Sequence, residues 1–340
     1  MELVVFKGIF WVTHTPARCA LMVMLCGFCA LAAAQALPPG YPNKSIRLLV
    51  GNAPGGGIDI TARVVAQKIS EKWGRNFVVD NRPGASGLIA LDMTQQAAPD
   101  GYTFLVTSGS LIASAMAQKK VPYDVRTAYA PVSQLTSLYY MLLINPSLPV
   151  NSVKELIAYG KSKPGALNYG SSGIGGAGHL GGELLASMAG MKMVHVPYKG
   201  GGLVLADLIS GQIQLGFTST ISGMPHVRSG RLKGLAMTSS KRAAAFADLP
   251  TLSEAGVPGF ELINWYGLFG PANMSPAIVA LLHRDVSQSL ATAEAQQAFA
   301  KDGADAAPSA SPEAFRRVLV KEVEDWQKVV KLPGFAEALR

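Results

Sequence analysis

Three segments rich in glycine or serine are candidate binding loops, and the first runs from Gly51 to Asp59. Its three consecutive glycines come directly before Ile58, where an apolar stripe of helical spacing begins. They leave backbone N–H groups open at the start of a helix, where the helix dipole also attracts an anion. The alternative is a tight turn that needs glycine. The ligand-binding candidates of this loop are Asn52, Ala53, Pro54, Gly55, Gly56, Gly57 and Asp59. For Asp59, capping the first helical turn is the favoured role.

The second candidate loop runs from Ser171 to His179, again between an expected strand and an expected helix. Its glycines match the pattern G-x-G-x-x-G, which a dinucleotide site follows with an acidic residue at the end of the next strand. That strand ends in residues 196–199 without an acid, so a dinucleotide site is disfavoured. His179 could face a ligand or satisfy the turn. The ligand-binding candidates here are Ser171, Ser172, Gly173, Gly175, His179, Tyr198 and Gly200.

The third candidate loop is short and follows an expected strand that ends near Val106. Three hydroxyl groups and a glycine at a strand end could donate hydrogen bonds to a second carboxylate, although Ser110 could instead be only a helix N-cap. The candidates are Thr107, Ser108, Gly109 and Ser110, with Thr218 and Ser219 expected nearby. Together the loops predict a site for an anion.

The motifs of several common enzyme classes are missing. There is no G-x-S-x-G and no G-x-x-x-x-G-K-[ST], so neither a hydrolase elbow nor a P-loop is indicated. The histidines beyond residue 36 are widely spaced, and none has a second histidine or a cysteine at i+3 or i+4, so a zinc site is unsupported. Basic residues form no cluster of the kind that nucleic acid requires. We therefore expect no catalytic residue, no metal, no cofactor and no nucleic-acid partner.

The first 36 residues have the pattern of an export signal. A start that is poor in acids is followed by an apolar run, residues 20–34, and by the small-x-small triplet Ala34-Gln35-Ala36. We expect cleavage after about Ala36 and a periplasmic location; a retained membrane anchor is the alternative. All three cysteines fall inside this segment, so the mature chain would have no disulfide. Its formal charge would fall from +8 to +7, a diffuse positive balance that agrees weakly with an anionic ligand.

Expected strands and helices alternate along the rest of the chain, whose composition (49% hydrophobic, 15% charged) is typical of a folded protein. Strands are expected at 46–50, 77–79, 102–107, 168–170, 193–196, 213–217 and 232–237. Helices are expected at 58–73, 88–97, 151–163 and 179–188, and two more begin at Ser275-Pro276 and Ser311-Pro312. This alternation predicts an α/β fold with mostly parallel sheets that are covered by helices. Ligands in such folds bind where strands end and helices begin.

Many ordered segments of the chain, from about Tyr41 to Leu339, resemble the Bug, or TctC-like, family of periplasmic receptors for tripartite tricarboxylate transporters. The matching segments are Tyr41-Pro42 with Ile46-Arg47, the first glycine loop with Asp59 and Ala62-Arg63, residues 79–85, 99–103, 129–132, 167–173 with His179-Leu180, 196–201 and 250–256. So many matches in order are more specific than any single loop.

The resemblance implies a Venus-flytrap fold of two α/β lobes joined by two crossing strands, near residues 132–143 and 260–269. We expect lobe 1 to comprise residues 37–134 and 264–340, and lobe 2 to comprise residues 135–263. It also implies a carboxylate ligand held by backbone and hydroxyl groups, membrane permease subunits as partners, and a monomer. A sensor for a signalling partner, or an enzyme on the same scaffold, are the rival functions.

Two positions depart from the family pattern. Gly51 and Asn52 stand where the family usually has proline and an aromatic residue, which predicts a smaller and more polar pocket wall. Residues 217–220 lack the acid that amino-acid binders tend to carry after this strand. An acid there could pair with an ammonium group. Its absence leads to the hypothesis that the ligand has no free amine.

Overall fold

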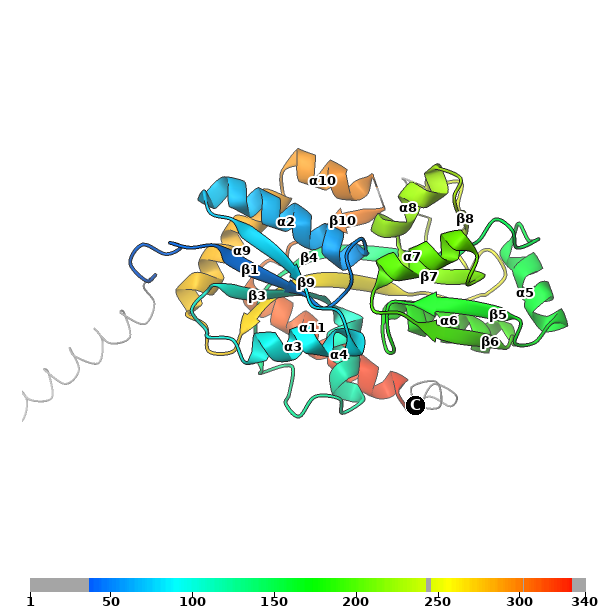
Figure 1. The fold of residues 1–340 in the computed structure, drawn as a ribbon, viewed down its shortest axis with the longest axis horizontal. Coiled ribbons are helices and arrows are strands. Elements are labelled where there is room, and N and C mark those ends of the chain that lie inside the picture. The colour runs from blue at the N-terminus through cyan, green and yellow to red at the C-terminus, as the bar shows by residue number, and fades with distance from the viewer. Residues whose placement is uncertain (1–36, 243–245, 302, 332–340) are drawn as a thin grey trace, which may run out of the picture.

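The computed structural model describes residues 37–242, 246–301 and 303–331 of the 340-residue chain. The expected export signal at residues 1–36 lies outside the described residues. The described chain forms two lobes, connected by the strands β4 (Tyr129–Ile144) and β9 (Ile263–Pro271), as Figure 1 shows. In the part of the chain that is described, no helix is both long and apolar enough to cross a membrane.

The first lobe combines the early and late parts of the chain around one sheet in the order β2-β1-β3-β9-β4, with β10 also paired to β4. Its further elements are β1 (Ile46–Val50), α2 (Gly57–Trp73), β2 (Phe77–Asn81), a short 3₁₀ turn (Ala85–Gly87), α3 (Leu88–Gln95), β3 (Thr103–Ser108), α4 (Gly109–Ala117), α9 (Pro276–Leu290), α10 (Ala293–Ala300), β10 (Ala304–Ala306) and α11 (Pro312–Val329). Helices α2 and α10 lie on one face of this sheet, and α3, α4 and α11 lie on the other (Figure 1).

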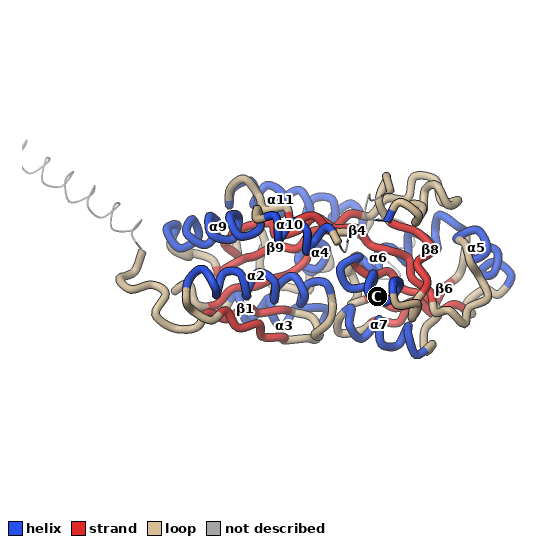
Figure 2. Tube along the Cα trace, turned by 90° about the horizontal axis from the view of Figure 1, so that it is seen from above, coloured by secondary structure: helices blue, strands red, loops and turns tan. Residues whose placement is uncertain are grey.

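The second lobe is continuous in sequence between the two connecting strands. Its sheet has the order β4-β7-β5-β6, and β8 also pairs with β4. Its further elements are α5 (Val153–Ser162), β5 (Leu167–Ser171), α6 (Ala177–Ala189), β6 (Met193–Pro197), α7 (Gly201–Ser210), β7 (Leu215–Ser219), α8 (Thr220–Arg228) and β8 (Lys233–Met237). Seen from above, the two lobes lie side by side along the long axis, as Figure 2 shows.

Strand β4 belongs to both lobes. Its first part, up to Tyr139, pairs with β9, and its last five residues, from Tyr140 to Ile144, pair with β7. An unbroken strand of 16 residues therefore carries the chain from one sheet into the other. The lobe boundaries expected at residues 134/135 and 263/264 stay a prediction.

The two sheets are mixed, which refines the expectation of mostly parallel strands. The strands that alternate with helices pair in parallel, β1 with β2 and β3, and β5 with β6 and β7. The connecting strands run antiparallel to their neighbours: β9 to β3 and β4, and β4 to β7, β8 and β10. The alternation of strands and helices predicts parallel pairing only for strands that a crossover helix connects. Strands β4 and β9 pair with other strands than those that adjoin them through a helix in sequence, so they can run antiparallel.

Three local signals for helix starts are confirmed, whereas the possible N-cap at Ser110 is wrong, because Ser108 caps α4. Ser152 caps α5 by accepting a hydrogen bond from the backbone of Glu155, whose carboxylate accepts one from the N–H of Asn151. Helices α9 and α11 begin with a proline in the first turn, after Ser275 and Ser311. Each of these helix starts depends on residues within a few positions of one another, so it can be predicted from the sequence.

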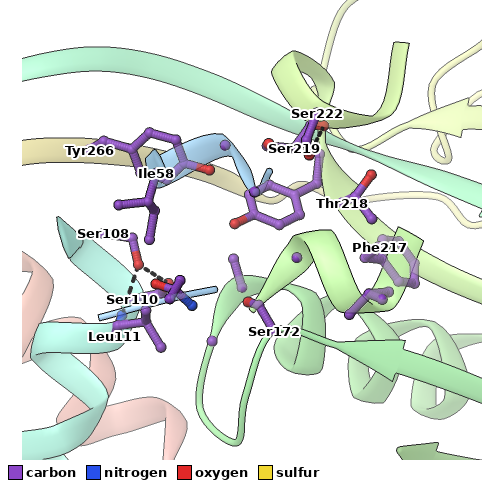
Figure 3. Close-up of a pocket in the computed structure, with 18 residues that line it drawn as sticks. Ile58, Ser108, Ser110, Leu111, Ser172, Phe217, Thr218, Ser219, Ser222 and Tyr266 are labelled. Carbon is purple, nitrogen blue, oxygen red and sulfur yellow. Dashed lines mark hydrogen bonds between the residues drawn. The ribbon is translucent and has the colours of Figure 1, made fainter. Parts of the chain in front are cut away.

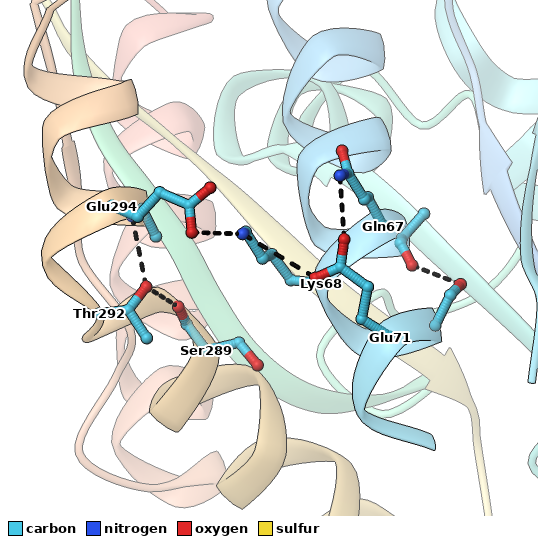
Figure 4. A network of polar contacts seen from close by, with 9 residues as sticks. Gln67, Lys68, Glu71, Ser289, Thr292 and Glu294 are labelled. Carbon is cyan, nitrogen blue, oxygen red and sulfur yellow. Dashed lines mark hydrogen bonds and ion pairs between the residues drawn. The ribbon is translucent and has the colours of Figure 1, made fainter. Parts of the chain in front are cut away.

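Contacts between distant parts of the chain hold the first lobe together. Lys68 of α2 donates to Glu294 of α10 over 2.7 Å and lies near Glu71 of its own helix (Figure 4). Further along α2, the indole N–H of Trp73 donates to Asp285 of α9 over 2.8 Å. The exposed pair contributes little by itself. The half-buried bond to Asp285 fixes how α2 lies, and α2 begins at the first glycine loop.

Candidate functional site

Five helices begin around one cavity between the lobes. Helix α2 follows β1, α4 follows β3, α6 follows β5, α7 follows β6 and α8 follows β7, so each start lies at the carboxyl end of a strand. The cavity is lined by Asn52, Gly56, Gly57, Ile58, Ser108, Ser110, Leu111, Tyr140, Ser172, Gly176, Ala177, Gly201, Val204, Phe217, Thr218, Ser219, Ser222 and Tyr266. The empty space of the cavity, including its opening to solvent, is about 450 Å³, which is in the range of pockets for small organic ligands. Only a small ligand fits.

The helix starts leave backbone N–H groups available to a ligand. The N-cap residues of α2, α6 and α7 are Gly56, Gly176 and Gly200, which have no side chain to cap with. Ser219 at the start of α8 makes no capping bond, whereas Ser108 caps α4 through the N–H of Leu111. The first N–H groups of a helix have no partner inside it, and the positive end of its dipole lies there. Converging starts therefore favour a buried anion.

The lining contains hydroxyl groups and no charged side chain among its members. Figure 3 shows Ser108 and Ser110 from the start of α4 on one side, and Ser219 and Ser222 from the start of α8 on another. Serine and tyrosine hydroxyls can donate to a carboxylate without a charge of their own. The cavity therefore offers neutral hydrogen-bond donors and no charged side chain.

Two tyrosines on the connecting strands complete the polar lining. Tyr140 lies on β4 and Tyr266 on β9, and both are buried. Burial raises the pKa of both phenols, and for Tyr266 the neighbouring Tyr140 adds to the effect. Both therefore remain protonated donors. The sequence does not predict that these tyrosines line the cavity, because each lies within an apolar strand segment that has no feature of a binding loop.

The two lobes are in contact across the cleft. The backbone N–H of Ala53, in the first loop, donates to the carbonyl of Lys199, just before α7, over 2.9 Å. Gly202 of α7 lies so close to the carbonyl oxygen of Pro54 that a Cβ atom there would overlap it. The structure therefore shows the arrangement in which the loops of both lobes enclose the cavity.

Asp59 holds the first loop in shape and does not line the cavity. Its carboxylate accepts hydrogen bonds from the N–H of Gly55, from Arg63 and from Asn81, each 3.0 Å long. Burial alone would raise the pKa of Asp59, but the bonds from Arg63, Gly55 and Asn81 together lower it below its ordinary value. The side chain of Asn81 also donates to the carbonyl of Asn52 over 2.9 Å. This network positions the loop.

Eight of the twenty candidate residues line the cavity. They are Asn52, Gly56, Gly57, Ser108, Ser110, Ser172, Thr218 and Ser219. The other twelve lie behind or beside it: Ala53, Pro54, Gly55, Asp59, Thr107, Gly109, Ser171, Gly173, Gly175, His179, Tyr198 and Gly200. Ten lining residues were not expected: Ile58, Leu111, Tyr140, Gly176, Ala177, Gly201, Val204, Phe217, Ser222 and Tyr266. Three of these, Ile58, Gly176 and Ala177, lie within the expected loops between named candidates, and Leu111 and Gly201 each directly follow a candidate.

Behind the second loop, His179 and His195 stack with their ring centroids 4.1 Å apart. The Nδ1 atom of His179 accepts from the N–H of Gly175 over 3.1 Å, and Nε2 of His195 lies 2.7 Å from Oγ of Ser171. His179 therefore supports the turn. Within the described ranges, no three His, Cys, Asp or Glu side chains are grouped so that they could hold a metal ion.

The buried histidine stack predicts a loss of stability in mild acid. Burial lowers the pKa of His179 to about 3, with His195 and Lys120 adding to the effect, and lowers that of His195 to about 4. Below pH 6.5 the histidines of the unfolded chain bind protons, whereas His179 and His195 of the folded protein stay neutral. Their contribution to the free energy of unfolding is therefore fully present above pH 6.5 and is lost as the pH falls toward 4. We expect the free energy of unfolding to decrease by about 2 kcal/mol between pH 7 and pH 5, allowing for the partial exposure of His195.

Urea unfolding at pH 7, 6 and 5 measures this decrease. The variant His195→Phe keeps a ring in the stack but cannot take up a proton, so its stability should depend less steeply on pH than that of the wild type. The same pH dependence in both proteins would show that the stack is not its source.

Comparisons with known proteins agree with this architecture. The family model described as "Tripartite tricarboxylate transporter family receptor" matches residues 61–335. Protein BugT of Bordetella pertussis is 34% identical over 296 residues, which are 86% of this chain and 90% of BugT. The solved structure described as "R. palustris Rpa4515 with adipate" is 34% identical with a TM-score of 0.82, over 86% of this chain and 97% of that one.

A second solved structure, MatC from Rhodopseudomonas palustris with bound malate, is 28% identical with a TM-score of 0.80. It covers 86% of this chain and all of the MatC chain. The likeness confirms the two-lobed periplasmic-binding-protein fold. By its sequence, its lobes and the loops around its cavity, this chain belongs to the family of tripartite tricarboxylate transporter receptors.

Proposed function

We propose that this receptor binds a small organic carboxylate between its lobes and delivers it to the membrane permease subunits of a tripartite transporter, as a monomer that catalyses no reaction. One observation carries the ligand class: five helix starts and a set of neutral hydroxyls converge on a cavity whose lining has no charged side chain. Two similar structures were solved with adipate and with malate, which supports the same class.

The proposal extends to the location and to the lobes. We infer that residues 1–36 are removed after about Ala36 and that the mature chain works in the periplasm. We also infer that residues 37–134 with 264–340 move against residues 135–263 when a ligand binds. A ligand that contacts both lobes favours the closed arrangement by the difference between its affinities for the two states.

A thermal-shift panel of carboxylates tests the ligand class. The protein is unfolded and refolded first, so that any ligand bound during expression is removed. A true ligand at 100 times its dissociation constant should add about 2.7 kcal/mol to the free energy of unfolding. Succinate and glutarate should stabilise the protein more than aspartate and glutamate, because an ammonium group would be buried among helix starts with no acid to pair with.

Two results would contradict the proposal. Tighter binding of aspartate or glutamate than of the plain dicarboxylates would overturn the exclusion of amines. If no carboxylate stabilised the protein at millimolar concentration, the ligand class itself would be wrong. Following the bound acid by NMR in the same samples checks the absence of catalysis, since any conversion would contradict it.

A further inference from the structure

We infer that Asn52 selects carboxylates that carry a hydroxyl group over their unsubstituted counterparts, an inference that rests on the proposed function. Asn52 is 4% exposed and lines the cavity. Its side-chain oxygen, Oδ1, is buried and has no hydrogen-bond partner among the residues that the structure describes. A buried acceptor without a donor carries an energetic cost that a ligand can remove.

The position of Asn52 is held by its surroundings. Its backbone carbonyl accepts from Asn81 over 2.9 Å, and the N–H of the next residue, Ala53, donates across the cleft to Lys199. Asn52 therefore lines the cavity from a loop that is tied to its own lobe and to the other one. The partner that we infer for Oδ1 is a group of the ligand in the cavity.

The other lining groups make a hydroxyl the matching donor. Helix starts and hydroxyls offer an excess of donors, which suits the oxygens of a carboxylate. In the amide orientation of the structure Asn52 presents Oδ1, which can only accept a hydrogen bond, whereas a hydroxyl oxygen can also donate one. An ammonium group would reach it only at the cost of burying a positive charge near the positive ends of helix dipoles. A neutral hydroxyl on the ligand has no such cost.

A second buried oxygen without a partner, Oγ1 of Thr218, does not compete for this role. A Cβ atom built on Gly223 would lie 2.7 Å from Thr218 Oγ1, so this oxygen faces α8. The structure assigns the recognition of the hydroxyl group to Asn52 for this reason.

Calorimetry with three matched pairs tests the inference: malate against succinate, 2-hydroxyglutarate against glutarate, and citrate against tricarballylate. We expect the hydroxylated member of at least one pair to bind about tenfold or more tightly, because a buried polar group is paired in one complex and unpaired in the other. In the variant Asn52→Leu, which has a similar size, this ratio should fall to about one while the unsubstituted acid keeps its affinity.

Ser222→Ala provides the matched control. Ser222 also lines the cavity, but its hydroxyl already bonds to Ser219, so the change should alter both members of a pair by the same factor. The wild-type ratios need no variant, so the test holds even if Asn52→Leu folds poorly.

Two outcomes would overturn the assignment. Equal affinities within every pair would refute it while leaving carboxylate binding intact. An equal loss for both members in Asn52→Leu would show that Asn52 donates to the carboxylate instead. Failure of all six acids to bind would instead count against the proposed function.

Discussion

The variant Gly202→Ala should bind its carboxylate about 100-fold more weakly than the wild type while folding normally. Gly202 lies in the first turn of α7, and a Cβ atom there would overlap the carbonyl oxygen of Pro54 in the other lobe. The carbonyl oxygen of Pro54 belongs to the backbone and cannot avoid the added methyl group by changing a rotamer. The lobes would therefore be held further apart. Overpacking of this kind costs about 1–3 kcal/mol, up to roughly 100-fold in affinity.

The effect should fall on closure alone. Inside a helix alanine is more favourable than glycine by about 1 kcal/mol. The substitution should therefore not destabilise the protein when its lobes are apart. Separation would also stretch the hydrogen bond from Ala53 to Lys199, which joins the same two loops. Calorimetry with the best carboxylate of the panel, together with the melting temperature of the ligand-free protein, distinguishes a closure defect from a folding defect.

Gly234→Ala is the control for adding a methyl group. A Cβ atom on Gly234, in β8, would make only ordinary contacts of 3.5 Å with Leu249, far from the cleft residues. Affinity should remain at the wild-type value. If Gly202→Ala bound its ligand as tightly as the wild type, the contact between the lobes in this structure would not be part of the bound state.

The variant Phe315→Ala should lower the free energy of unfolding by about 3–5 kcal/mol, because truncation of a fully buried phenylalanine removes apolar contacts and leaves a cavity. Phe315 is 0% exposed and extends from α11 onto β9. Its ring lies 4.9 Å from that of Phe269 and 5.2 Å from that of Trp265, measured between centroids. It covers Gly267, where a Cβ atom would overlap the ring.

Urea unfolding measures this loss, and Arg317→Ala on the exposed side of the same helix should change the stability by less than about 0.5 kcal/mol. Ligand affinity of the folded Phe315→Ala protein should stay near the wild-type value, since Phe315 does not line the cavity. A small effect on stability would mean that α11 is not a structural part of the first lobe. A large loss of affinity in folded protein would mean that packing under β9 controls the site.

Several residues of the site are predictable because the requirement on them is local. Gly56 and Gly57 precede a helical stripe, so both can be placed at a helix start from their neighbours. In the third loop the possible N-cap was Ser110, whereas Ser108 caps α4 in the structure. Since parallel strands bring such starts to the same edge, their convergence follows from the strand–helix rhythm. The expected anion site depends on nothing more distant than this.

Other residues cannot be assigned without the tertiary structure. Tyr140 and Tyr266 become part of the lining only because β4 and β9 pass under the cavity on their way between the lobes. The sequence left a ligand contact open for Asp59 and His179, and the structure shows that Asp59 is hydrogen-bonded to Arg63 and Asn81 and that His179 is hydrogen-bonded to Gly175. Which polar group meets a ligand depends on which partners folding has already supplied.

The sequence by itself determined the α/β class, the starts of α2 and α6, the expectation of an anion site and the resemblance to a receptor family, because each depends on residues close in the chain. Only the tertiary structure decided that β4 and β9 run antiparallel to their neighbours, that the cavity is small, and that Asn52, which lines it, has a buried oxygen without a partner among the described residues. Those features depend on contacts between segments that are distant in sequence, and no local pattern of residue types records such contacts.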